Sequence, residues 1–416
     1  MTIGILGGGQ LGYMLALAGY PLGLRFRFLD PSPEAPVGRI AQRVTADFAD
    51  EPALEKFVAG LELVTYEFEN VPVAATRFLA ERVPVYPPPA TLEVAQDRLR
   101  EKALFHRLGV ATTEFAPVSN SKTLDAGIRK LGFPSVLKTC RLGYDGKGQW
   151  MLRNDADVAN AKISLGEELG STNSNGSDPS QKQPAFIVER FVSFSRELSI
   201  LAVRGRDGEV AFYPLVENRH HGGILRLSLG PAPALDSAIQ SEAEIIARRV
   251  LEALDYVGVL AIEFFECQGR LLANEMAPRV HNSGHWTIEG AVTSQFENHL
   301  RAILGLPLGS TAAPGFAAML NLIGDTPSTP DVLAIPGAHL HLYGKSPRTG
   351  RKLGHVTLCA DTFERLSANL RGLPEYFQQP QFCLQPPSVG QASSTQSHSA
   401  GTRVSGTPTA VQNRRN

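Results

Sequence analysis

The 416-residue sequence has little of what marks an exported or membrane-bound protein. It holds four cysteines, and Cys140, Cys267, Cys359 and Cys383 form neither a C-x-x-C pair nor a zinc-site spacing, so we expect reduced thiols. It contains no run of about 18 apolar residues, and no basic segment precedes an apolar one at the N-terminus. These absences predict a cytoplasmic protein that does not bind a membrane.

An excess of charge of either sign is also lacking. The sequence has 40 basic and 41 acidic side chains, which gives a formal net charge of -1. No overall field would therefore attract the protein to nucleic acid. Small molecules are the expected partners.

Short apolar runs alternate with amphipathic stretches over the first 90 residues. Runs at 2–6, 24–29, 43–45 and 63–66 predict strands, with helices between them. This rhythm predicts a parallel α/β sheet covered by helices. Since a domain usually has about 100 to 200 residues, the length of 416 indicates several domains, and we expect three.

The chain after residue 90 has a different pattern. The proline-rich stretch Y-P-P-P-A-T-L-E at 86–93 predicts a hinge, and helical periodicity follows over 92–108. Strands joined by glycine turns over 133–267 then predict a second, mixed α+β domain. Short strands with tight turns from 316 to about 365 predict a small antiparallel third domain.

Two segments have the composition of disordered chain. Residues 167–184 are polar and small, with almost no apolar side chains to repay the entropy of ordering. Residues 379–416 are similarly biased toward serine, glutamine, glycine and proline. We expect a disordered insertion and a disordered tail.

The first candidate site is the glycine cluster in T-I-G-I-L-G-G-G-Q-L-G-Y-M. Gly7, Gly9 and Gly12 follow a predicted strand and precede a predicted helix, and Asp30 closes the next strand. This is the pattern of a dinucleotide fingerprint. The backbone N–H groups of such a turn can equally bind another ribose phosphate, or the turn can be purely structural. The first domain alone leaves these three interpretations open.

A second glycine-rich stretch, R-L-G-Y-D-G-K-G-Q-W at 141–150, predicts a loop that folds over a polyphosphate. An ordinary glycine hairpin is the alternative. Two charged residues within apolar strands favour the phosphate site, Lys138 in P-S-V-L-K-T and Glu189 in I-V-E-R-F-V. An unpaired charge in such a run would be costly.

Two glutamates indicate a metal site. The segments A-I-E-F-F and R-L-L-A-N-E predict a β-hairpin with a loop at 268–270, which places Glu263 and Glu275 opposite each other, roughly 5 Å apart at Cα. Their repulsion costs stability unless a cation lies between them, and Mg²⁺ suits a few carboxylates plus phosphate oxygens. An exposed pair on a solvated face is the alternative, which the apolar neighbours of Glu263 disfavour.

Two polar clusters complete the set. Arg279, His281, Asn282 and His285 lie in M-A-P-R-V-H-N-S-G-H-W-T, directly after a predicted strand, where active-site loops commonly lie. We do not expect the histidines to bind a metal, and surface polar residues are the alternative. The turn K-S-P-R-T-G-R-K at 345–352 concentrates positive charge, either as a phosphate anchor or as a solvated basic hairpin.

Seven separated stretches carry a family resemblance. They are G-G-G-Q-L-G-Y-M at 7–14, T-Y-E-F-E-N-V at 65–71, Q-D-R-L-R-E-K at 96–102, G-Y-D-G-K-G-Q at 143–149, N-E-M-A-P-R-V-H-N-S-G-H-W-T at 274–287, S-Q-F-E-N-H-L-R-A at 294–302 and Y-G-K-S-P-R-T-G-R-K-L-G-H at 343–355. Over about residues 1–375 the chain resembles the ATP-grasp superfamily and, within it, the N5-carboxyaminoimidazole ribonucleotide synthetase family of purine biosynthesis.

The resemblance implies a fold and a reaction. The fold is a Rossmann-like pre-ATP-grasp domain over 1–90, an ATP-grasp domain over 91–306 with a lid at about 115–192, and a small antiparallel β C-terminal domain over 307–378. In the reaction, ATP phosphorylates bicarbonate to carboxyphosphate, the amine of 5-aminoimidazole ribonucleotide is carboxylated, and ADP and phosphate leave. Mg²⁺ or Mn²⁺ is the implied cofactor, ATP is a co-substrate, and a homodimer is implied.

The resemblance also assigns residues by matching position. Glu263 and Glu275 would bind the metal. The ATP-binding residues would be Arg98, Lys138, Gly143, Tyr144, Asp145, Gly146, Lys147, Gly148, Gln149, Glu189, Arg190, Phe191, Val192, Glu197, His220, Asn274 and Glu275. The ribonucleotide would contact Gln10, Leu11, Glu67, Arg279, His281, Asn282, Lys345 and Arg351. Catalytic roles would fall to Tyr144, Asp145, Arg279 and Lys345, the first two for the amine proton.

The resemblance assigns the opening glycines to the ribonucleotide and leaves Asp30 no role beyond ending its strand. The insertion at 167–184 and the tail depart from the family pattern. Two competing hypotheses are an ATP-grasp ligase with another acceptor, such as a formate-using glycinamide ribonucleotide transformylase or a biotin carboxylase, and a nicotinamide-binding dehydrogenase or noncatalytic nucleotide sensor.

Overall fold

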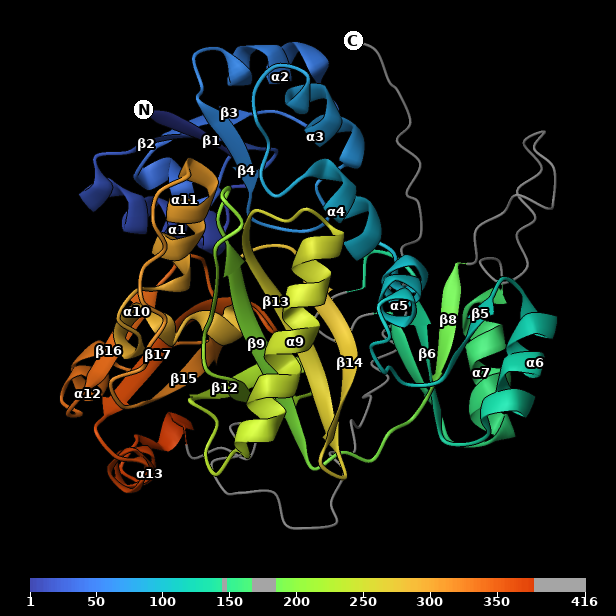
Figure 1. Cartoon of the computed structure of the whole chain (residues 1–416). Coiled ribbons are helices and arrows are strands. Elements are labelled where there is room, and N and C mark those ends of the chain that lie inside the picture. Colours follow the sequence, from blue (N-terminus) through green and yellow to red (C-terminus); the bar gives the residue numbers. More distant parts are fainter. Residues whose placement is uncertain (144–147, 167–184, 378–416) are drawn as a thin grey trace, which may run out of the picture.

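The structure of the chain, a computed structural model, describes residues 1–143, 148–166 and 185–377 (Figure 1). Within these ranges the chain forms three β-sheets. The predicted insertion at 167–184 and the predicted tail at 379–416 lie outside the described residues, as do Tyr144, Asp145, Gly146 and Lys147. No helix in the described ranges is long and apolar enough to cross a membrane.

The N-terminal part is a four-stranded parallel sheet in the order β3-β2-β1-β4, as the sequence predicts. Its strands are β1 (Thr2–Leu6), β2 (Arg25–Asp30), β3 (Gln42–Thr45) and β4 (Leu63–Tyr66), and its helices are α1 (Gln10–Gly19), α2 (Glu51–Val58) and α3 (Val73–Ala80), with 3₁₀ turns η1 (Tyr20–Leu22) and η2 (Pro36–Arg39). Nearly every residue of β1 and β4 is buried, as is typical of parallel strands with covered faces.

The helical stretch predicted over 92–108 is two helices. α4 (Pro89–Ala95) starts inside the predicted proline hinge, since proline is favoured at the first position of a helix. α5 (Arg98–Arg107) starts after Asp97, whose side chain accepts hydrogen bonds from two N–H groups of its first turn. The prediction missed this break because the capping aspartate lies within an unbroken helical periodicity.

A smaller sheet forms the predicted lid segment, on one side of the molecule in Figure 1. Its antiparallel strands have the order β5-β8-β6-β7. They are β5 (Phe115–Val118), β6 (Ser135–Thr139), β7 (Gln149–Leu152) and β8 (Phe186–Arg190), and the helices α6 (Ser121–Leu131) and α7 (Asp155–Ser164) belong to the same segment. Lys138 and Glu189 therefore come from adjacent strands.

The central sheet has nine strands, in the order β14-β13-β9-β11-β12-β15-β17-β16, with β10 paired to β9. They are β9 (Arg196–Arg204), β10 (Val210–Phe212), β11 (Val216–His221), β12 (Ile224–Gly230), β13 (Gly258–Cys267), β14 (Arg270–Ala277), β15 (Phe316–Ile323), β16 (Ala338–Leu342) and β17 (Lys352–Ala360). Alternate residues of β9 belong to two cores, one with α9 (Ser237–Ala253) and one with α11 (Gln295–Leu304). Each helix thus covers one face of the sheet.

The C-terminal antiparallel strands continue this sheet instead of forming one of their own. β15 pairs with β12, and β17 pairs with both β15 and β16. The remaining short elements are η4 (Asn282–Gly284), α10 (Thr287–Gly290), α12 (Thr329–Leu333), α13 (Phe363–Arg371) and η5 (Glu375–Phe377). The antiparallel strands are as predicted, and the predicted domain boundaries stay predictions.

Candidate active site

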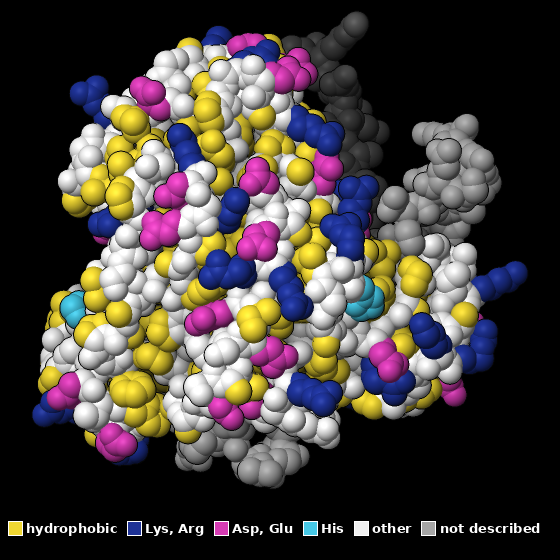
Figure 2. Space-filling model, in the orientation of Figure 1, with side chains coloured by type: hydrophobic (Ala, Val, Ile, Leu, Met, Phe, Trp, Pro, Cys, Tyr) yellow, Lys and Arg dark blue, Asp and Glu magenta, His cyan; other side chains and the backbone are white. Residues whose placement is uncertain are grey.

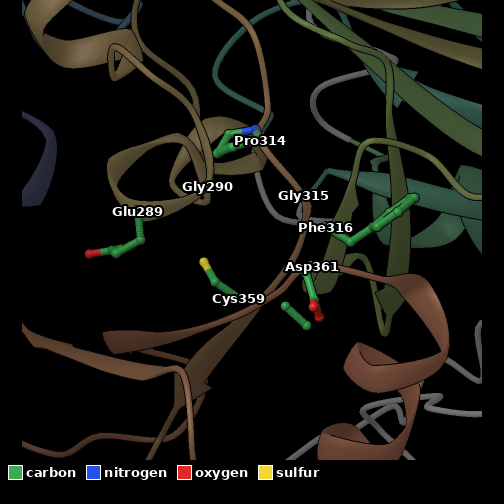
Figure 3. Close-up of a pocket in the computed structure, with 8 residues that line it drawn as sticks. Glu289, Gly290, Pro314, Gly315, Phe316, Cys359 and Asp361 are labelled. Carbon is green, nitrogen blue, oxygen red and sulfur yellow. The ribbon is translucent and has the colours of Figure 1, made fainter.

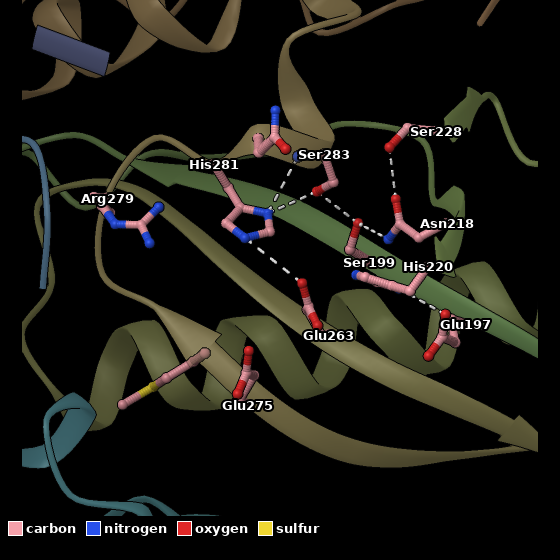
Figure 4. Close-up of polar contacts among 12 residues, drawn as sticks. Glu197, Ser199, Asn218, His220, Ser228, Glu263, Glu275, Arg279, His281 and Ser283 are labelled. Atoms are coloured by element: carbon pink, nitrogen blue, oxygen red, sulfur yellow. Dashed lines mark hydrogen bonds and ion pairs between the residues drawn. The ribbon is translucent and has the colours of Figure 1, made fainter. Parts of the chain in front are cut away.

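The hairpin of β13 and β14 carries the two carboxylates predicted to bind a metal, Glu263 and Glu275. They are directly opposite each other in the register (Figure 4). The predicted three-residue loop is wrong, because the turn consists of Gln268 and Gly269 alone, both at positive φ. A β-bulge at Asn274 supplies the missing residue and restores the predicted pairing.

The two carboxylates of Glu263 and Glu275 have different electrostatic surroundings. The Arg98 guanidinium of α5 lies 2.7 Å from a Glu275 oxygen. Burial raises the pKa of Glu275, but Arg98 outweighs it and holds that pKa well below its usual range. Burial and the charge of Glu275 raise the pKa of Glu263. The positive charges of His220 and Lys352 act in the opposite direction on Glu263 but do not outweigh these two effects.

These residues fit a magnesium site. The Glu263 side chain is 18% exposed and that of Glu275 is 40% exposed, so a ligand can reach both oxygens. The side-chain oxygen of Asn274, between β14 residues Ala273 and Glu275, is buried and has no hydrogen-bond partner in the described part of the chain. Oxygen donors of this kind, completed by phosphate oxygens, are those that Mg²⁺ prefers.

The two charged residues of the lid strands pair with each other. The Lys138 ammonium lies 2.7 Å from one Glu189 oxygen, and the Lys102 ammonium lies 3.6 Å from the other. Burial raises the pKa of Glu189, but these two ammonium groups lower it to about 2. Glu189 therefore stays ionised and is shared by two lysines.

Sequence reasoning assigned no role to Glu101 and Lys102. Lys102 is 1% exposed and donates to the backbone oxygen of Asn274 at 3.0 Å, whereas Glu101 accepts from the Met276 N–H at 2.6 Å. The helix α5 thus holds β14 on both sides of Glu275. Both residues lie in the quoted motif Q-D-R-L-R-E-K, but adjacent charges in a helical pattern usually indicate a solvent-facing surface.

His220 and Glu197, both predicted at the nucleotide, form an ion pair between β11 and β9. The His220 Nδ1 lies 2.7 Å from a Glu197 oxygen (Figure 4). Burial lowers the pKa of His220, but Glu197 outweighs it and raises that pKa to about 9. The imidazole is therefore protonated at neutral pH.

This pair predicts a pH-dependent contribution to stability. The folded pKa of about 9 exceeds the unfolded value of about 6.5, so the contribution is complete below about pH 6.5 and is lost as the pH rises to about 9. His220→Asn should lower the free energy of unfolding by about 1 to 3 kcal/mol at pH 6 and by little at pH 9.5. Denaturant unfolding across this range measures the difference; a pH-independent difference would show that the pair is not charged.

Carboxylates already occupy the N–H groups of the opening glycine loop. Glu67 accepts from the N–H groups of Gly9 and Gly12, and Asp30 accepts from Gly8 at 2.7 Å. A dinucleotide pyrophosphate would need these same donors, which argues against the dehydrogenase hypothesis. The expectation that Asp30 merely ends its strand was wrong, since its carboxylate also holds the loop.

Three distant segments meet beside this loop. The Lys345 ammonium, after β16, donates to the Gln10 side-chain oxygen of α1. Burial lowers the pKa of Lys345 to about 8. Arg279, after β14, pairs with Glu69 of the stretch T-Y-E-F-E-N-V. Sequence analysis gave Glu69 no role, because Glu67 was the only acidic residue of that stretch to which a role was assigned.

The loop after β14 is largely enclosed, with Arg279, His281 and Asn282 half-buried and His285 buried, which disfavours the surface alternative. Gln295 of α11 accepts from the His281 N–H at 2.9 Å and donates to its carbonyl at 2.7 Å. The amides of Asn282 and Asn321 hydrogen-bond reciprocally, at 3.0 and 2.7 Å. His285 is fully buried beside the ring of His355. That Asn282 contacts the ribonucleotide stays a prediction.

Other predicted residues lie apart from these contacts. Arg190 pairs with the exposed Glu114, and Arg351 donates to the carbonyl of Ser346 in its own turn. Leu11 is buried in the core that also contains α11. Five predicted site residues remain. Phe191 and Val192 follow β8, and Gly143, Gly148 and Gln149 flank the undescribed residues 144–147.

A pocket of about 270 Å³ lined by Glu289, Cys359 and Asp361 contains none of the predicted site residues (Figure 3).

Three family models match the chain. They are the ribonucleotide synthetase preATP-grasp domain over residues 1–96, the ATP-grasp domain over 103–296 and the phosphoribosylaminoimidazole carboxylase C-terminal domain over 317–369. With the paired glutamates and the buried lysines, these matches define an ATP-grasp enzyme.

Relatives specify the family further. The N5-carboxyaminoimidazole ribonucleotide synthase of Pseudomonas aeruginosa is 53% identical over 362 residues, which cover 87% of this chain and 95% of that protein. The crystal structure of the corresponding synthetase from Thermus thermophilus matches with a TM-score of 0.82 at 58% identity, covering 90% of this chain and 99% of that one. The chain belongs to the N5-carboxyaminoimidazole ribonucleotide synthase family.

One related structure holds ligands. The N5-carboxyaminoimidazole synthase of Aspergillus clavatus, solved in complex with ADP and 5-aminoimidazole ribonucleotide, matches with a TM-score of 0.80 at 30% identity. The match covers 89% of this chain and 96% of that one.

Proposed function

We propose that the protein carboxylates 5-aminoimidazole ribonucleotide with bicarbonate, consumes ATP, and releases N5-carboxyaminoimidazole ribonucleotide, ADP and phosphate in de novo purine biosynthesis. The observation that carries this proposal is the opposed pair Glu263 and Glu275, flanked by Arg98 on one side and by the loop of Arg279 and His281 on the other. The name of the Pseudomonas relative and the ligands of the Aspergillus structure support the same reaction.

The nucleotide would bind beside the lid strands. Glu263 and Glu275 would hold Mg²⁺ or Mn²⁺, which neutralises phosphate charge when bound. Phosphoryl transfer to bicarbonate needs mainly positioning and charge neutralisation, which Lys138 and Arg98 supply. When Lys138 turns from Glu189 to a phosphate, Lys102 would keep the buried carboxylate paired.

The ribonucleotide would bind where the three distant segments meet. Lys345, with Arg351, would hold its phosphate, since both carry the positive charge of the same turn. Arg279 would bind an anionic oxygen near the metal, held in place by its ion pair with Glu69. Tyr144 and Asp145, our candidates for the amine proton, lie outside the described residues.

The chain's partners would otherwise be small molecules. Side chains of both charge signs are mixed over the face in Figure 2, with no field that would attract nucleic acid. A cytoplasmic homodimer is part of this proposal.

A coupled assay tests the reaction. The protein is mixed with ATP, Mg²⁺ and ¹⁴C-bicarbonate, and 5-aminoimidazole ribonucleotide is then added. We expect ADP release and ¹⁴C incorporation to require both the ribonucleotide and bicarbonate. ADP release that is indifferent to the ribonucleotide would contradict the proposal, turnover with formate or biotin would favour another acceptor, and tight NADH binding would favour a dehydrogenase.

A further inference from the structure

Four buried polar residues form a continuous hydrogen-bonded chain that ends at His281 (Figure 4). We call it the Ser228 chain; its members are Ser228 of β12, Asn218 of β11, Ser199 of β9 and Ser283 of η4. The successive distances are 2.8, 2.9 and 2.8 Å, and none of the four is more than 4% exposed. The chain crosses three strands of the central sheet to reach the loop after β14.

The orientation of the Asn218 amide gives the hydrogen bonds of the chain a direction. Ser228 donates to the Asn218 oxygen, so the amide NH₂ of Asn218 faces Ser199 and can only donate. Ser199 must therefore give its own hydrogen to Ser283. The Ser283 hydroxyl, whose own hydrogen remains free to donate, lies 2.8 Å from the His281 Nδ1. The orientation of the Ser228–Asn218 hydrogen bond therefore influences which hydrogen bonds the His281 imidazole can form.

The acceptor nitrogen of His281 receives a second donor. The backbone N–H of Ser283 also donates to Nδ1, at 3.3 Å. A nitrogen that accepts two hydrogen bonds carries no hydrogen, so the hydrogen of a neutral imidazole must be on Nε2. This tautomer follows from the donors alone.

The opposite nitrogen faces the proposed reaction centre. His281 Nε2 lies 3.6 Å from a Glu263 oxygen, which is too far for a hydrogen bond, and no described residue accepts its hydrogen. Gln295 fixes the backbone of His281 on both sides, so the ring has little freedom to turn away. The structure therefore presents an N–H donor beside the paired glutamates.

We propose that the Ser228 chain is a positioning device that holds His281 as the Nε2–H tautomer, so that this N–H donates to an anionic oxygen of the bound reactants. The identity of that oxygen rests on the proposed function, whereas the tautomer does not. A chain that only satisfied polar groups in the core would work equally well in either direction. Reversing its direction therefore separates the two roles.

Asn218→Asp performs this reversal. A carboxylate cannot donate to Ser199, so Ser199 turns its hydrogen to the introduced carboxylate, Ser283 turns its hydrogen to Ser199, and Nδ1 loses the hydroxyl hydrogen. With ¹⁵N-histidine labelling, assigned by comparison with His281→Gln, we expect an unprotonated Nδ1 and a protonated Nε2 in the unaltered protein. In the variant Nδ1 keeps only the 3.3 Å contact from the Ser283 N–H, so we expect its ¹⁵N resonance to shift and part of the imidazole to carry its hydrogen on Nδ1. The kcat/KM for the ribonucleotide should fall about 10- to 100-fold, with the KM for ATP unchanged.

Asn369→Asp is the matched control, since Asn369 lies on α13 and its side-chain amide donates to the Pro336 carbonyl, outside the Ser228 chain. If Asn218→Asp does not fold, Ser228→Ala replaces it: kcat/KM for the ribonucleotide should fall about fivefold, and Ser241→Ala on α9 should change nothing. A hydrogen on Nδ1 in the unaltered protein, or full activity in the reversing variant, overturns the proposal. Absence of any ribonucleotide-dependent turnover refutes the proposed function alone, because the ¹⁵N spectra still report the tautomer.

Discussion

Glu275→Gln is expected to lower kcat at least about a thousandfold while leaving the fold intact. The change removes one of two opposed carboxylates without changing side-chain volume, and its amide can still accept from Arg98. Metal-assisted charge neutralisation contributes several kcal/mol to the transition state, and about 4 kcal/mol corresponds to a thousandfold. ADP formation at saturating ATP and ribonucleotide measures the effect.

Glu266→Gln is the matched control for this variant. Glu266 lies on the same hairpin and is more buried than Glu275, but it pairs with Arg196 away from the proposed metal site. The kcat of this variant should stay within about threefold of the unaltered protein, since a threefold change corresponds to the free energy of one weak hydrogen bond. Full activity in Glu275→Gln would show that the paired carboxylates do not bind the catalytic metal.

Arg279→Met is expected to lower kcat/KM for the ribonucleotide at least about a hundredfold, the second largest effect. Its side chain is 14% exposed and pairs with Glu69, so the loop after β14 is joined to the N-terminal sheet. Removing one partner of a buried ion pair costs about 3 to 5 kcal/mol, because the other charge is left uncompensated. Steady-state kinetics with the ribonucleotide varied measures the loss, and the KM for ATP should change little.

A double variant separates binding from stability. Glu69→Gln with Arg279→Met no longer leaves a buried charge unpaired, so thermal stability should recover while activity stays low. Arg301→Met is the control, since Arg301 pairs with Glu297 one turn away on α11 and should be neutral. Recovery of activity in the double variant would mean that Arg279 only neutralises Glu69.

Local patterns predicted most elements of the fold but not their long-range pairing. The parallel N-terminal sheet follows from short apolar runs between amphipathic stretches, and β1 and β4 lie where predicted. The join of β12 to β15 did not follow, because strands far apart in sequence carry no signal of which edge they share. The sequence pattern therefore predicted a separate sheet for the C-terminal strands.

The candidate site was predictable where a charge interrupts an apolar run. Lys138, Glu189 and Glu263 stand out in this way, and the structure pairs the first two. Lys102 was not predictable, since its partners lie in other segments and its own helix looks solvent-facing. Ser199 and Ser228 belong to no motif, because small polar residues on strands are common and their hydrogen-bond directions exist only in three dimensions.

The most direct test of the central claim is a crystal structure of the protein with ADP and Mn²⁺, with anomalous scattering used to locate the metal. We expect a manganese peak bonded to carboxylate oxygens of both Glu263 and Glu275 and to a nucleotide phosphate. A manganese ion held by the nucleotide alone, with either glutamate turned away from it, would contradict the account.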